Sequence, residues 1–111
     1  MDEQVIGPDL VLSTDRDGNL VVLTVKGELD AYSAPALEDQ FGRLIAERVD
    51  IVVLDLSQTA FCDSSGLRAI LTSQRRLQEN RGLMRLRAPS EAVKRLLDIT
   101  GLTDHFATEG F

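Results

Sequence analysis

Hydrophobic and polar positions divide the chain into short segments that alternate in type. Two segments rich in aliphatic and β-branched residues, 10–13 and 20–25, flank a turn cluster at residues 15–19. Glycine and asparagine in that cluster tolerate positive φ, and aspartate can accept hydrogen bonds from nearby backbone groups. We therefore predict two antiparallel strands joined as a hairpin, preceded by a polar lead-in at residues 1–9.

Three later segments have apolar residues at helical spacing. The first begins near Ser33, a suitable N-cap residue, and the second extends from about Ser64 to Asn80. The third has Ser90 as its expected N-cap and Gly101 as its expected C-cap. The core positions predicted for these helices are Leu37, Phe41, Leu44, Ile45, Leu67, Ile70, Leu71, Leu77, Val93, Leu96 and Leu97.

Two further strands separate these helices. Residues 51–54 are apolar in succession, which is typical of a strand covered on both faces, and in residues 83–87 Met84 and Leu86 alternate with Arg85 and Arg87. Strands that alternate with helices imply parallel pairing through crossover helices. We predict a single α/β domain over residues 1–111, with a mixed central sheet of four to five strands and about three to four helices. The sheet begins with the antiparallel hairpin and continues with parallel strands, and the last residues add a short strand or helix.

Composition and charge exclude several classes of function. The chain has 111 residues, of which 43% are hydrophobic and 27% charged, so one domain is expected. Twelve Lys and Arg against 18 Asp and Glu give a net charge of −6, which disfavours direct binding to nucleic acid or to an anionic membrane. The longest aliphatic run, 51–54, is far shorter than the ~20 residues of a membrane span, and the acidic start does not resemble a signal peptide. We expect a cytoplasmic protein.

Candidate enzymatic chemistry is sparse in this sequence. The single Cys62 and the single His105 exclude an internal disulfide and a cysteine- or histidine-rich metal site. Ser64, His105 and an aspartate could form a hydrolytic triad on paper, but there is no G-x-S-x-G elbow and no phosphate-binding glycine motif. Cys62 is better explained as a small apolar residue ending a buried strand than as a nucleophile. We expect no enzyme activity, no cofactor and no metal, and we keep a small hydrolase as the contrasting class.

The most informative segment, residues 53–67, runs from the central strand through a loop to the start of a helix. Loops at the carboxyl ends of parallel strands are common functional sites. Asp63, Ser64 and Ser65 crowd the helix start, and helix capping explains one of them but not all three. Gly66 in the first turn costs about 1 kcal/mol relative to alanine, which indicates close approach by another group. The pattern fits a binding or modification site and equally a capped helix start.

The run at 61–67, with G-E-L-D at 27–30 and the segments 93–97 and 100–102, resembles a STAS domain, most closely the stand-alone bacterial anti-sigma-factor antagonists. In that family the first serine after the aspartate is phosphorylated by a partner kinase that is also the anti-sigma factor. The resemblance implies that Ser64 is the phosphorylation site. The partner-binding residues that it implies are Asp30, Asp63, Ser64, Ser65, Gly66 and Arg68.

The resemblance also implies a switch. The unphosphorylated chain would bind an anti-sigma-factor serine kinase and free the sigma factor, phosphorylation of Ser64 would abolish binding, and a serine phosphatase would reset it. The free protein is expected to be a monomer. Ser65 remains an alternative, secondary site of phosphorylation. The alternative is a cytoplasmic STAS subunit of a membrane lipid-transport ATPase without phosphoregulation. A basic set with no family counterpart, either a solvated face or a docking surface, comprises Arg68, Arg75, Arg76, Arg85 and Arg87.

Overall fold

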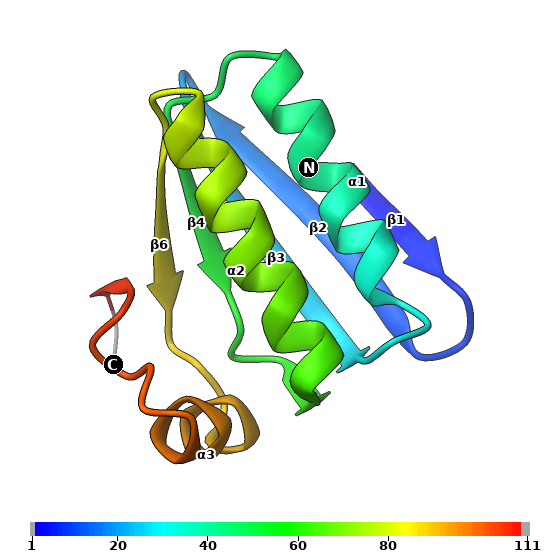
Figure 1. Ribbon diagram of the computed structural model, residues 1–111. Helices are drawn as coiled ribbons and strands as arrows, with labels where there is room; N and C mark the ends of the chain where they lie inside the picture. Colours follow the sequence, from blue (N-terminus) through cyan, green and yellow to red (C-terminus); the bar gives the residue numbers. More distant parts are fainter. Residues whose placement is uncertain (1, 110–111) are drawn as a thin grey trace.

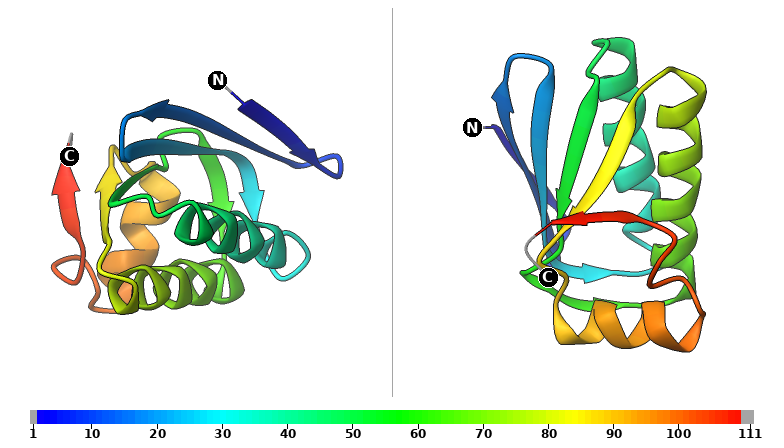
Figure 2. Two further views of the ribbon diagram at one scale, coloured as in Figure 1. Left: turned by 90° about the horizontal axis from the view of Figure 1, so that it is seen from above. Right: turned by 90° about the vertical axis from the view of Figure 1, so that its left-hand side faces the viewer.

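A mixed sheet with two long helices on one face forms the body of the molecule in the computed structural model, which describes residues 2–109 (Figures 1 and 2). The strands are β1 (Asp2–Ile6), β2 (Leu10–Asp17), β3 (Leu20–Leu29), β4 (Ile51–Asp55), β5 (Thr59–Cys62), β6 (Leu83–Arg87) and β7 (Ala107–Glu109). The helices are α1 (Ala34–Ala46), α2 (Ser64–Glu79) and α3 (Glu91–Ile99).

The sheet order is β1-β2-β3-β4-β6-β7, with β5 paired to β3 beyond the end of β4. Strands β1, β2 and β3 pair antiparallel, and every other pairing is parallel. The predicted fold class is thereby confirmed, with its antiparallel hairpin, parallel strands and three helices. The predicted number of four to five strands is wrong, since the described residues form seven strands.

The polar lead-in predicted at residues 1–9 is wrong for residues 2–6. Residues 2–6 form the edge strand β1, which pairs with β2 from Asp2 opposite Thr14 to Ile6 opposite Leu10. Residue 1 lies outside the described part of the chain. Because an edge strand is held mainly by backbone hydrogen bonds and one face of β1 meets solvent, its side chains carry no strong apolar signal. Val5 is 67% exposed, whereas Ile6 packs against the core.

The core lies between the sheet and the pair α1 and α2. Leu23, Val25 and Leu54 of the sheet are fully buried, as are Leu37 and Phe41 of α1. Of the predicted core positions, all are buried except Ile45, Leu71 and Leu96, which pack against the rim of the core. Within residues 2–109, no helix combines the length and the apolar character needed to cross a membrane.

Helix boundaries follow the predicted signals at α3 but not at α1. The Ser90 hydroxyl accepts a hydrogen bond from the Val93 N–H at 3.4 Å, and Gly101 follows the helix with φ +73°, as expected. At α1, Ser33 occupies the N-cap position but its hydroxyl makes no cap. It instead donates to the Glu28 carbonyl at 2.9 Å. The predicted position of the N-cap is therefore correct, but the predicted capping hydrogen bond is wrong.

Candidate functional site

The predicted site lies where the carboxyl ends of β3 and β5 meet the start of α2. Leu29 is opposite Cys62 in the parallel pairing of these strands, and the Asp63 N–H donates to the Leu29 carbonyl at 3.3 Å. Asp30 and Asp63, which follow the paired residues, are therefore brought to the same edge although 33 positions separate them. Strand β5, which the sequence analysis did not predict, creates this proximity.

Asp30 organises the loop that leads into α1. Its Oδ1 accepts hydrogen bonds from the N–H groups of Tyr32 at 3.0 Å and Ser33 at 3.1 Å. The Ser33 hydroxyl in turn accepts from the Asp30 N–H at 3.0 Å. This closed turn leaves Tyr32 77% exposed, with its ring near Gly7 in the turn between β1 and β2. A large exposed aromatic at a loop tip is a common interface anchor, and no periodicity in the sequence singled it out.

Asp63 is the N-cap of α2. The backbone of Asp63 is extended, and its Oδ1 accepts a hydrogen bond from the Gly66 N–H at 2.9 Å. Asp63 therefore caps the helix. Within the described chain, the Ser64 and Ser65 hydroxyls make no hydrogen bond. Ser64 is exposed and Ser65 is half-buried. The structure thus distinguishes the three crowded residues: one carboxylate builds the helix start, and Ser64 presents a free hydroxyl to solvent.

Gly66 is buried under the first turn of α2. A β-carbon at this position would lie 2.5 Å from the Leu29 carbonyl oxygen and 2.9 Å from the Cys62 Sγ. The close approach inferred from the sequence is therefore real, but the approaching group is the protein's own strand rather than a ligand. Gly66 positions Ser64 and offers no surface of its own in this structure.

Cys62 and His105 do not supply hydrolytic chemistry. Burial first, and the nearby Asp63 second, raise the pKa of the Cys62 thiol to about 12, so the group stays protonated at neutral pH. His105 Nε2 lies 3.0 Å from Oε1 of Gln74, ten residues along α2 from Ser64 and therefore about 15 Å away along the helix axis. Neither Cys62 nor His105 is therefore placed to activate the Ser64 hydroxyl.

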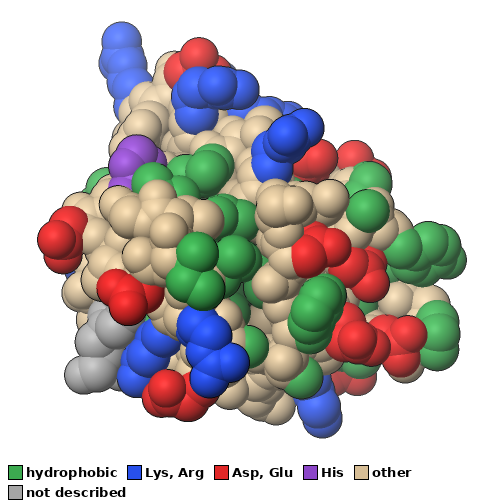
Figure 3. Space-filling view, turned by 60° about the horizontal axis from the view of Figure 1, so that its bottom comes forward, with side chains coloured by type: hydrophobic (Ala, Val, Ile, Leu, Met, Phe, Trp, Pro, Cys, Tyr) green, Lys and Arg blue, Asp and Glu red, His purple; other side chains and the backbone are tan. Residues whose placement is uncertain are grey.

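The surroundings of Ser64 are acidic and partly apolar. Asp30 and Asp63 lie at this sheet edge, Glu28 is paired with Phe61 across β3 and β5, and Tyr32 and the 46% exposed Phe61 are the exposed aromatic residues of these segments. Figure 3 views this end of the molecule and shows acidic and hydrophobic side chains interspersed on one side of it. Such a mixture is typical of a protein-binding surface rather than of a small-molecule cavity.

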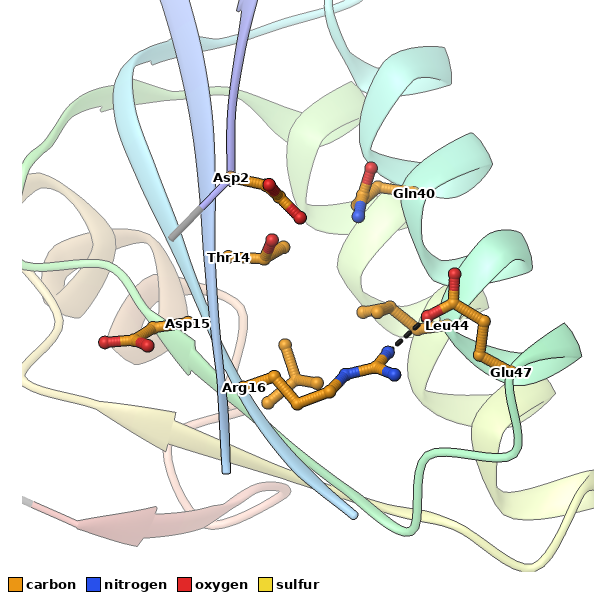
Figure 4. Close-up of a pocket in the computed structure, with 8 residues that line it drawn as sticks. Asp2, Thr14, Asp15, Arg16, Gln40, Leu44 and Glu47 are labelled. Carbon is orange, nitrogen blue, oxygen red and sulfur yellow. Dashed lines mark hydrogen bonds and ion pairs between the residues drawn. The ribbon is translucent and has the colours of Figure 1, made fainter. Parts of the chain in front are cut away.

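A cavity of about 450 Å³ lies elsewhere, between α1 and the strands β1 and β2. It is polar, and the ion pair between Arg16 and Glu47 spans one side of it (Figure 4). Asp2, Thr14 and Gln40 also line it. None of its residues belongs to the predicted site, so the two features are separate.

The predicted basic set does not form one face. The Arg87 guanidinium pairs with Glu109 at 2.6 Å, and Arg85 lies 3.9 Å from the same carboxylate. Arg76 reaches across to α1 and donates to the Glu38 carbonyl at 3.3 Å. Among the described residues, only Arg68 and Arg75 of the set make no ion pair and no hydrogen bond.

The fold and this helix-start site define a class of protein, and comparison with known families agrees. The STAS domain family matches residues 12–110, and the chain belongs to that family. Within it the chain is similar to anti-sigma-factor antagonists. The anti-sigma-B factor antagonist of Bacillus subtilis strain 168 is 33% identical over 86 residues, which are 78% of each chain.

Solved structures show the same likeness. An anti-sigma factor antagonist from Mycobacterium paratuberculosis has a TM-score of 0.80 and 28% identity, over 92% of this chain and 86% of that one. The antagonist SpoIIAA in its unphosphorylated form gives 0.76 at 23% identity, over 88% and 87% of the two chains. SpoIIAA in its phosphorylated form gives 0.70 at 22% identity, over 88% and 90%. The SpoIIAA likeness establishes the fold alone.

Proposed function

We propose that this chain is an anti-sigma-factor antagonist whose binding to an anti-sigma-factor serine kinase is controlled by phosphorylation of Ser64. The unphosphorylated chain binds the kinase and frees the sigma factor, and the phosphorylated chain does not bind. The chain itself is a regulator without catalytic activity or cofactor, since ATP belongs to the kinase. The observation that carries the proposal is the exposed, unbonded Ser64 hydroxyl, presented by a helix start that Asp63 caps.

The chemistry of a phosphate at this position favours a switch at an interface. A phosphoserine adds roughly −1.5 to −2 charges and three acceptor oxygens. Because Ser64 has no internal partner, the fold loses no contact on modification, and the helix start stabilises the phosphate by about 0.3–1 kcal/mol. A like charge of a partner at ~4 Å costs about 4 kcal/mol per pair before salt screening, at an effective dielectric constant of about 20. That is about a thousandfold in affinity.

The names of the similar proteins support the proposal that this chain is an anti-sigma-factor antagonist. The Bacillus subtilis relative is an antagonist of an anti-sigma factor, and the structural neighbour SpoIIAA is known in an unphosphorylated and a phosphorylated form. We place the chain in the cytoplasm, with a serine phosphatase that resets Ser64, and without direct contact to nucleic acid or membrane. Ser65, being half-buried, is the poorer acceptor.

The test is a pull-down from native lysate with wild type, Ser64→Ala and Ser64→Glu as baits, followed by mass spectrometry. Ala46→Glu is the matched control. It adds one negative charge at the C-terminal end of α1, which lies at the other end of the molecule from the start of α2 (Figure 1). We expect a serine kinase of the anti-sigma type with wild type, Ser64→Ala and Ala46→Glu, and its loss with Ser64→Glu.

Two other results would change the interpretation. Equal retention of membrane-transporter components by all four baits would favour a STAS subunit of a transport ATPase, with Ser64 as an ordinary helix residue. Phosphosite mapping after incubation with the captured kinase and ATP must place the phosphate on Ser64. Modification of Ser65 alone would contradict the assignment.

A further inference from the structure

A groove runs along the outer face of α2 and begins at Arg68, one turn after Ser64. Its volume is about 430 Å³, and its lining residues are Arg68, Leu71, Thr72, Gln74, Arg75, Gln78 and His105. The loop after α3 forms the far wall, where His105 is held by Gln74 and packs edge-on against Phe106. The groove is therefore a built feature, shaped by a helix and by a loop anchored to it.

Helical spacing joins this groove to Ser64. Ser64, Arg68, Leu71 and Arg75 follow one another at intervals of four, three and four residues, which places them on one stripe of α2. Arg68 is one turn, about 6 Å, from Ser64, and Arg75 is about 16 Å away along the axis. A partner that contacts Ser64 can therefore continue along the groove without leaving α2.

The groove carries two positive charges on a chain whose net charge is negative. Arg68 and Arg75 are exposed and, within the part of the chain that the structure describes, unpaired, although the chain carries a net charge of −6. Arg85 and Arg87 are by contrast paired with the Glu109 carboxylate, and Arg76 donates a hydrogen bond to the backbone carbonyl of Glu38. Leu71, half-buried between the two free guanidinium groups, adds an apolar contact. Two free arginines flanking an aliphatic residue complement an acidic amphipathic segment.

We infer that this groove docks an acidic segment of the partner protein, with Arg68 and Arg75 pairing its carboxylates and Leu71 meeting an apolar side chain between them. The inference rests on the proposed function for the identity of that partner, the anti-sigma-factor kinase. The segment bears carboxylates about 10 Å apart, the axial separation of the two arginines.

The same geometry gives Arg68 a part in the switch. A phosphate on Ser64 stands at position i with Arg68 at i+4, the spacing at which opposite charges pair on a helix. The phosphate therefore occupies the guanidinium that the partner's carboxylate would otherwise use. Arg75 is too far from Ser64 for this competition. Phosphorylation weakens docking by removing one of the two anchors, in addition to direct repulsion.

A double-mutant cycle in this chain, with binding to the purified kinase as the readout, tests both the docking site and the competition for Arg68. Arg68→Gln and Arg75→Gln are each expected to weaken binding about five- to tenfold, whereas Arg48→Gln, an exposed arginine after α1, leaves it unchanged. The effect of Ser64→Glu should be several-fold smaller in the Arg68→Gln background and unchanged in the Arg75→Gln background. Wild-type affinity in both arginine variants would overturn the docking site. Additivity of Ser64→Glu with Arg68→Gln would overturn the competition.

A peptide titration tests the groove without the kinase. The probe is a 16-residue amphipathic helical peptide with glutamate and leucine on one face, and the control replaces glutamate by lysine. In the isotope-labelled chain we expect saturable shifts of the Arg68, Leu71 and Arg75 side-chain signals with the acidic peptide only. Equal shifts with both peptides, or none up to about 1 mM, would overturn the inference. If the peptide binds here but no kinase is captured, the proposed function fails while the groove's preference stands.

Discussion

Gly66 in the first turn of α2 lies so close to the end of β3 that a β-carbon would stand 2.5 Å from the carbonyl oxygen of Leu29. This contact fixes the height of the helix start above the sheet edge. It also fixes Ser64, two residues earlier, at the surface. The glycine therefore acts on the site through position, without touching a partner itself.

We predict that Gly66→Ala destabilises the fold by about 2 kcal/mol or more, because the nearest obstructing atom is a backbone carbonyl oxygen, which cannot turn aside. The matched control is Gly42→Ala in α1, whose β-carbon would meet only the flexible end of Arg76 at 3.1 Å. The control should be neutral or up to about 1 kcal/mol stabilising, since alanine favours a helix interior. Urea unfolding of both variants measures the difference, and equal stabilities would contradict the packing described for Gly66.

Asp63→Ala removes the acceptor of the Gly66 N–H and should lower the free energy of unfolding by about 1 kcal/mol. Asp63→Asn retains an Oδ1 acceptor and should lie within a few tenths of a kcal/mol of wild type. Thermal unfolding at neutral pH compares the three proteins. A loss as large in the asparagine variant as in the alanine variant would show that the carboxylate charge, not the cap, matters for stability.

Asp30 has a structural and a proposed binding role that one substitution can separate. Asp30→Asn keeps an oxygen for the N–H groups of Tyr32 and Ser33, so stability should change by less than about 0.5 kcal/mol. If the charge of Asp30 contributes to the surface around Ser64, affinity for the kinase should fall several-fold. Calorimetric titration of the variant measures this, and unchanged affinity would confine Asp30 to its loop.

The buried thiol of Cys62 makes stability depend on alkaline pH. Its pKa is about 12 in the folded chain against an ordinary value of 9.0, so the folded state holds the proton more tightly than the unfolded state. The corresponding stability is complete below about pH 9 and declines by up to about 1.4 kcal/mol per pH unit between pH 9 and 12. Urea unfolding at pH 8 and pH 10.5 should show this decline.

Cys62→Ala is the control for this pH effect. The quantity compared is the slope of the free energy of unfolding against pH, not the free energy itself. The variant loses the titrating group, so the thiol's share of the decline should vanish while that of other residues remains. Identical pH slopes in wild type and variant would refute the assignment to Cys62. In native wild type, alkylation at pH 8 should also be slow and should become fast on unfolding.

Much of the fold is accessible from periodicity. The helices α1, α2 and α3 and the central strand β4 follow from apolar spacing, because each buries a continuous face or both faces in one core. The strands β1 and β5 escape this reasoning, and for the last residues it leaves strand and helix open, where the structure has β7. They are short or lie at edges, and β5 has only Thr59 and Cys62 buried. Strands of this kind are specified by their partners rather than by their own patterns.

The sequence by itself determined that Asp63, Ser64, Ser65 and Gly66 stand at a helix start after a central strand, because local propensity and the family motif are properties of the chain. It could not say which residue caps, what Gly66 approaches, or which arginines are free. The approach to Gly66 and the pairing of the arginines depend on Leu29, Glu38 and Glu109, which are distant in sequence from their partners and meet them only in the folded chain. Only the tertiary structure decided them, since long-range packing assigns each polar group its partner.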